Sequence, residues 1–261
     1  MSPKIQLLVS LMTIACQCAH AGETSKAEPE HDQVKPGIGI TQSFPHRNAP
    51  QPIPIPPDAF EGVSNVLFLL DCSKSMDQIA SDKETKFKKA VALIEKTLSK
   101  MPESLNYGLR VFGQQDEEHY IDPDRATKML IEPAPGQKKV IKRALLSIKA
   151  YGMCPISYCL DQVFEKDLVH LGGKTVLVLL IDGPDTCGHN PVELIKTMPR
   201  RGLPEAKIIV LSLADRRQQS ASEMHRELAA LTNGAYYNRE KIDSFPSDVK
   251  KITSRLDNVS R

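Results

Sequence analysis

Residues 66–76 read VLFLLDCSKSM, five apolar residues followed by Asp71 and then by mostly small or polar ones. Residues 176–181 (VLVLLI) form a second apolar run that also precedes an aspartate, Asp182, and residues 206–211 form a third. A strand that is apolar at every position is buried on both faces, which is typical of a parallel sheet with helices on each side. Weaker strand candidates are residues 107–113, 128–132 and 235–238.

Helical patterns separate these strands. Apolar residues recur at steps of three and four, which places them on one face of each helix. Lysines fill the other face of the first helix, and we expect that face to be solvated. The alternation of strands and helices over residues 63–261 predicts one doubly wound α/β domain with a mostly parallel central sheet. Pro191 opens one helix, and the apolar stripes of the others are Phe87, Val91, Ile94, Leu98 and Met101; Val140, Ala144, Leu145 and Ile148; Ile156, Leu160 and Val163; Met224, Leu228 and Leu231; and Val249, Ile252 and Leu256.

Residues 1–21 have the pattern of a signal peptide. Lys4 precedes an apolar run at 5–15 that is too short to span a bilayer, and Ala19-His20-Ala21 matches a signal-peptidase site. Cleavage after Ala21 is the first interpretation, and lipidation at Cys16, which would attach the protein to a membrane, is the second. Both predict a secreted, periplasmic or cell-envelope location.

Residues 22–62 are polar and rich in proline, without apolar periodicity, and are predicted to form a disordered linker.

The whole chain carries 34 basic and 32 acidic residues, for a formal net charge of +2. No basic block stands out as a footprint for nucleic acid, so we expect no nucleic-acid partner. Oligomeric state is left open.

Carboxylates and hydroxyls follow the two most apolar strands. Asp71, Ser73 and Ser75 come directly after the first, and Asp182 after the second. Ligand sites in open α/β sheets lie beyond the carboxyl ends of the strands. Two carboxylates and two hydroxyls are hard oxygen donors of the kind that bind Mg²⁺ or Mn²⁺, with Ca²⁺ as a further candidate.

Five segments in register resemble the von Willebrand factor type A (VWA) domain family, over about residues 63–258. The likeness implies a protein-binding module with an α/β sandwich fold and a metal-ion-dependent adhesion site. The segments are the Asp-x-Ser-x-Ser motif at Asp71-Cys72-Ser73-Lys74-Ser75, the strand Tyr107–Gly113, the loop Gly152-Met153-Cys154-Pro155-Ile156, the segment Ile181–Gly188 and the turn Leu228–Tyr237.

The resemblance also implies residue roles. Ser73 and Ser75 would be direct metal ligands, Asp71 and Asp182 outer carboxylates, and a carboxylate of a protein partner would complete the shell. Cys154 stands where the family has a threonine ligand, and a thiol is a poor ligand for Mg²⁺. The alternative is a hydrogen-bonded remnant of the site that binds no metal.

Four cysteines remain after cleavage: Cys72, Cys154, Cys159 and Cys187. In the fold that the resemblance implies, Cys154 and Cys187 lie on loops at the same end of the sheet, and a disulfide between them would clamp the site. A free or inter-chain Cys187 is the alternative. Cys72 and Cys159 are expected to pack as small buried groups.

The first interpretation of function is an exported binding or adhesion module that is not an enzyme. The second is a metal-independent structural or assembly protein of the envelope. A phosphohydrolase of the haloacid dehalogenase type comes third, because it needs a second acid at the position of Ser73. A nucleotide-binding glycine loop is absent from the sequence.

Overall fold

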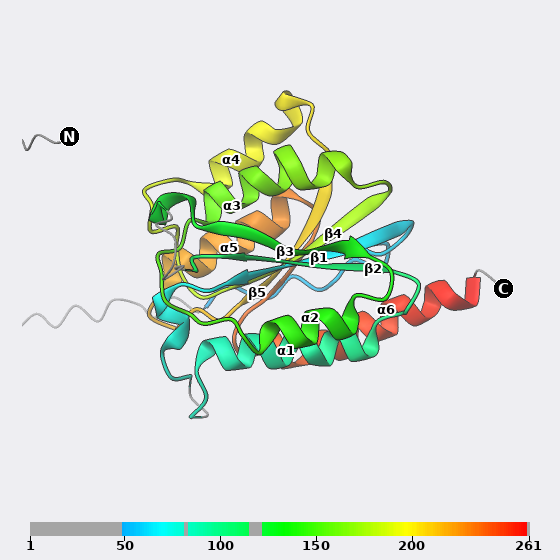
Figure 1. The fold of residues 1–261 in the computed structure, drawn as a ribbon, viewed down its shortest axis with the longest axis horizontal. Coiled ribbons are helices and arrows are strands. Elements are labelled where there is room, and N and C mark those ends of the chain that lie inside the picture. The colour runs from blue at the N-terminus through cyan, green and yellow to red at the C-terminus, as the bar shows by residue number, and fades with distance from the viewer. Residues whose placement is uncertain (1–48, 81–82, 115–121, 260–261) are drawn as a thin grey trace, which may run out of the picture. The chain divides into compact units, whose positions relative to one another are not determined.

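The predicted strands form a six-stranded sheet in the order β3-β2-β1-β4-β5-β6 (Figure 1). The computed structural model describes residues 49–80, 83–114 and 122–259. Of the six strands in the described residues, β3 alone runs antiparallel to its neighbour, so the prediction of a mostly parallel doubly wound sheet is confirmed. The strands are β1 (Val63–Asp71), β2 (Asn106–Phe112), β3 (Thr127–Ala134), β4 (Lys174–Ile181), β5 (Ala206–Ser212) and β6 (Ala235–Tyr237).

Helices cover both faces of this sheet. Figure 1 shows α1, α2 and α6 on one face and α3, α4 and α5 on the other. The chain thus forms three layers, as the apolar strands require. The helices are α1 (Lys86–Lys100), α2 (Lys138–Leu145), α3 (Ile156–Gln162), α4 (Pro191–Thr197), α5 (Gln219–Leu231) and α6 (Phe245–Val259).

Strand β1 serves both halves of the core. Its side chains alternate between the two faces of the sheet. Phe68 and Leu70 pack in the cluster that contains the buried residues of α1, α2 and α6. Leu67 and Leu69 pack in the cluster that contains those of α3, α4 and α5. This double burial explains why every residue in the middle of the strand is apolar.

Two sequence-based expectations were wrong in detail. Residues 49–62 belong to the folded unit rather than to a linker, because Ile53 exchanges backbone hydrogen bonds of 2.9 Å with Tyr236 and Phe60 is fully buried. On α2, Val140 is 49% exposed and the neighbouring Ile141 takes the buried position.

The predicted signal peptide (1–21), Cys16 and residues 22–48 of the predicted linker lie outside the described residues. Among the residues described, no helix has the length and apolar character needed to cross a bilayer.

The sheet reverses its winding between β1 and β4. After β1 the chain enters α1 on one face, and after β4 it enters α4 on the other face. The two strands are neighbours, with Leu70 opposite Leu180 in the ladder. Such a switch point opens a crevice at the carboxyl ends of the strands, which is where α/β folds place their ligand sites.

Candidate functional site

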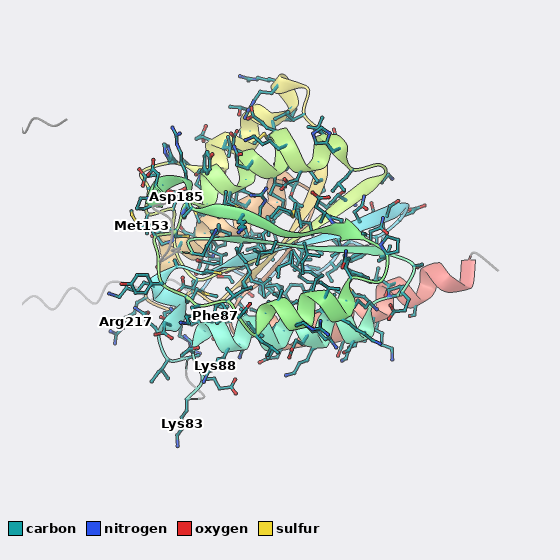
Figure 2. The ribbon with its side chains drawn as sticks, viewed as in Figure 1. Lys83, Phe87, Lys88, Met153, Asp185 and Arg217 are labelled. Carbon is teal, nitrogen blue, oxygen red and sulfur yellow. The ribbon has the colours of Figure 1, made fainter. Side chains whose placement is uncertain are left out.

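Four loops meet at the carboxyl edge of the sheet. They follow β1, precede α3, follow β4 and follow β5, and are called here the first, second, third and fourth loops. Figure 2 shows Met153, Asp185 and Arg217, one each from the second, third and fourth loops, at the same end of the molecule. We call this end the loop edge.

The first loop begins with Asp71, whose side chain is fully buried. Its Oδ1 accepts a hydrogen bond of 2.7 Å from the backbone N–H of Ser73, which turns the chain sharply out of the strand. Its Oδ2 lies 3.5 Å from the Sγ of Cys154 in the second loop. The carboxylate therefore ties two loops together through neutral donors.

The two serine hydroxyls of the motif connect the first loop to the third by hydrogen bonds. Ser73 Oγ lies 3.0 Å from Ser75 Oγ, and Ser75 Oγ donates to Asp182 Oδ1 at 2.7 Å. Asp182 is also fully buried. The structure thus brings together all four oxygen-bearing residues that the sequence analysis selected.

Two glycines let the second loop approach this closely. Gly152 N donates to Gly113 O, and Lys74 N donates to Gly152 O, both at 2.8 Å. A Cβ atom on Gly152 would lie 2.3 Å from Gly113 O, and Gly113 has a φ of +75°, a region that favours glycine. Glycine at both positions is therefore a condition for placing Cys154 beside Asp71.

The third loop is joined to the second by two side chains that the sequence analysis did not single out. Thr186 Oγ1 accepts a 2.7 Å hydrogen bond from Cys154 N. Asp185 accepts from Ser157 N at 2.9 Å and from Cys187 N at 2.8 Å. Both lie in the family-like segment 181–188, but only their contacts reveal that Thr186 holds the backbone of Cys154 and that Asp185 ties the start of α3 to the third loop.

Lys86 is the cation that sequence reasoning missed. Its side chain is only 1% exposed, contrary to the prediction that the lysines of the first helix are solvated. Nζ lies 2.9 Å from Asp182 Oδ2, 3.0 Å from Asp215 Oδ2 and 3.3 Å from Gln78 Oε1. A signal was present, because residue 86 shares the buried stripe of α1 with residues 90, 93 and 97.

The two aspartates therefore have different surroundings. Asp182 is paired with an ammonium group, whereas burial, reinforced by the charge of Asp182, raises the pKa of Asp71 to about 7. Burial likewise raises the pKa of the Cys154 thiol well above its ordinary value, so the thiol is the expected form at neutral pH. Burial therefore opposes a negative charge on Asp71, whereas the negative charge of Asp182 is compensated by Lys86.

The disulfide considered from the sequence is not formed. Cys154 and Cys187 are free thiols, as are Cys72 and Cys159, which pack in the core as expected. The Sγ of Cys154 faces Asp71, whereas that of Cys187 lies 4.0 Å from Pro123 O. The two thiols have separate partners, and the loops are joined by hydrogen bonds instead.

Two features of the cluster oppose the binding of a hard divalent cation. Mg²⁺ prefers an octahedron of oxygen ligands. Here a buried thiol replaces one donor, and Asp182 already carries an ammonium on its second oxygen.

Comparison with known proteins gives two relatives from Bacillus subtilis (strain 168). Uncharacterized protein YwmC is 28% identical over 141 residues, covering 52% of this chain and 62% of YwmC. Uncharacterized protein YwmD is 25% identical over 197 residues, covering 74% of this chain and 86% of YwmD. The chain thus spans less than two thirds of the first of these relatives. No protein-family model matches the chain.

Solved structures with similar folds are more distant in sequence. The manganese-loaded TRAP protein of Plasmodium vivax has a TM-score of 0.51 at 14% identity, covering 74% of each chain. The von Willebrand factor type A structure from Catenulispora acidiphila has 0.52 at 15%, covering 74% of this chain and 42% of that one. The pilus adhesin SpaC of Lactobacillus rhamnosus GG has 0.52 at 16%, covering 75% and 30%. Together with the order and direction of its strands, these likenesses show that the chain has a VWA-like fold.

Proposed function

We propose that the protein is an exported binding module that recognises a protein partner with its loop edge and catalyses no reaction. One observation carries the proposal. Large apolar side chains stand in solvent around the buried polar cluster: Ile79 is 73% exposed, Tyr151 62% and Met153 39%. Ile79 belongs to the first loop and the other two to the second.

Exposed apolar side chains are unfavourable in water, and a bound protein partner would cover them. Apolar side chains held in water on rigid loops are typical of interaction sites, and tyrosine and methionine are enriched at the centres of protein interfaces. The second loop is held by backbone hydrogen bonds from Tyr151 N to Cys72 O and from Lys74 N to Gly152 O, both of 2.8 Å. A loop held in this way loses little conformational freedom on binding.

The likeness to solved structures supports the same function class. SpaC, part of which has a similar fold, is named a pilus adhesin, and a binding role for this chain agrees with that name. The signal-peptide pattern of residues 1–21 supports a place outside the cytosol.

The two serines of the polar cluster contact no histidine in the described part of the chain. The hydroxyls of Ser73 and Ser75 contact each other and Asp182, and no described histidine lies within hydrogen-bond distance of either. The buried His225 bonds Ser212 Oγ and Gly183 O instead, both at 2.9 Å. Among the described residues, Ser73 and Ser75 thus have no histidine partner of the kind that activates the nucleophile of most serine hydrolases.

Cation-bridged capture of a carboxylate on the partner, with Mg²⁺ or Mn²⁺, is the second candidate. One observation favours it: the buried carboxylate of Asp71 has only neutral hydrogen-bond donors. Cys154 and Lys86 oppose it, for the reasons given above. We therefore place metal-independent recognition first.

Site-specific photo-cross-linking tests the proposed surface. A photoreactive residue at position 153 should cross-link a discrete protein partner in cell-envelope material. The matched control is position 231: Leu231 is 41% exposed, against 39% for Met153, but ends α5 at the opposite edge of the sheet. Equal cross-linking from both positions would point to an assembly protein without a dedicated edge, and cross-linking from position 231 alone would contradict the proposal.

A further inference from the structure

The ammonium of Lys86 occupies the centre of the loop edge. It contacts the first loop through Gln78, the third through Asp182 and the fourth through Asp215. Asp215 also pairs with Arg239, which follows β6. One side chain from the first residue of α1 thus joins three loops, which is the structural task of a metal ion in a site of this kind.

The burial of this lysine requires its partners. A lysine that is 1% exposed loses its hydration and remains charged only where carboxylates and hydrogen-bond acceptors replace the water. Asp182 and Asp215 supply two carboxylates and Gln78 supplies an amide oxygen, one acceptor for each of the three N–H groups. The ammonium is therefore fully satisfied where it lies.

A divalent cation bound beside Asp182 would lie close to the ammonium group of Lys86. Asp182 Oδ2 is committed to Lys86 at 2.9 Å, and Oδ1 accepts the proton of Ser75 at 2.7 Å. A divalent ion at Oδ1 would stand within a few ångströms of the ammonium in a site sheltered from water, where like charges repel strongly. It would also have to displace the hydrogen bond of Ser75.

We propose that Lys86 is the built-in cation of the loop edge, so that this edge keeps its shape and binds its partner without a divalent metal. The inference deepens the proposed function, on which it rests for the role of the edge. The thiol of Cys154 agrees with it, because a site that binds no Mg²⁺ or Mn²⁺ has no need of a hard oxygen donor at that position.

Metal titration of the full chain and two variants tests this inference without knowledge of the partner. Protein stripped with a chelator is titrated with Mn²⁺, followed by calorimetry and by the electron paramagnetic resonance signal of free Mn²⁺. Cys154→Thr restores the hard donor and keeps Lys86. The double variant Cys154→Thr with Lys86→Gln also removes the positive charge, while the glutamine amide can still donate to Asp182.

Wild type and Cys154→Thr should show no saturable binding at millimolar Mn²⁺. The double variant should bind at least ~100-fold more tightly, since removing one like charge from a partly buried site has an effect of that order. Saturable binding by wild type or by Cys154→Thr would overturn the inference, as would a folded double variant that binds no Mn²⁺. If the double variant does not fold, Cys154→Thr decides alone: no binding supports the inference and binding overturns it. Cross-linking from position 153 does not depend on these results, so the proposed function can fail separately.

Discussion

Replacing Asp182 by asparagine should lower the free energy of unfolding by about 3 kcal/mol, the lower end of the cost of breaking a buried ion pair. The asparagine amide would turn N–H groups or a weaker oxygen toward Lys86, whose side chain is 1% exposed. Asp215 would remain as its carboxylate partner, at 3.0 Å and 39% exposed, which keeps the loss at this lower end. Urea denaturation of the full chain at neutral pH measures the change.

Asp243→Asn is the matched control for this prediction. Asp243 also pairs with a lysine of α1, Lys89 at 3.2 Å, but is 66% exposed. Exposed ion pairs contribute about 0–1 kcal/mol, so the control should change stability little. Equal losses in the two variants would contradict the account of Lys86 as a buried cation that needs Asp182.

Replacing Asp71 by asparagine should have the opposite sign and raise the free energy of unfolding. Burial raises the pKa of Asp71 from 3.8 to about 7, which corresponds to about 4 kcal/mol of destabilisation above that pH. We expect asparagine to recover roughly half of it, about 2 kcal/mol, because its amide would face the Cys154 sulfur, a weak acceptor. The oxygen that accepts from Ser73 N is retained.

The pH dependence of this gain identifies its cause. The folded protein holds more protons on Asp71 than the unfolded chain does between pH values of about 4 and 7, so the contribution of Asp71 to stability falls as pH rises through that range. The buried His225 acts in the opposite direction, because its pKa of about 4 lies below the unfolded value of 6.5 and acid destabilises its folded form. The difference between Asp71→Asn and wild type, followed by urea denaturation across this range, isolates Asp71. A loss of stability at every pH would contradict the prediction.

Much of the fold could be predicted from the sequence because burial on both faces leaves a simple pattern. The apolar runs at 66–70, 176–181 and 206–211 all lie within central parallel strands. The boundaries of the elements and the contacts at the edge of the sheet were harder to predict from the sequence. Residues 49–62 have no apolar periodicity, yet Ile53 pairs with Tyr236 through backbone hydrogen bonds at the edge of the sheet, and its side chain is only partly buried against the core. Backbone pairing of a single residue leaves no periodic pattern in the sequence.

The candidate site could be predicted in part. Asp71, Ser73, Ser75 and Asp182 meet because their strands are parallel neighbours; the alternation of strands and helices predicts the shared edge, but not that these two strands are adjacent. The role of Lys86 could not be derived in the same way. It lies in a lysine-rich stretch with Lys88 and Lys89, and its charge is compensated by residues 96 and 129 positions away.

The measurement that tests the central claim most directly is the affinity of the cross-linked partner for wild type and for Tyr151→Ser, with and without a chelator. Tyr151 is 62% exposed on the loop edge, and Val169→Ser, at a site 53% exposed ahead of β4, is the control. We expect Tyr151→Ser to weaken binding by about tenfold or more, as for a central tyrosine of an interface, and Val169→Ser and the chelator to leave it unchanged. Loss of binding with the chelator, or an unchanged affinity for Tyr151→Ser beside a loss for Val169→Ser, would contradict metal-independent recognition by the loop edge.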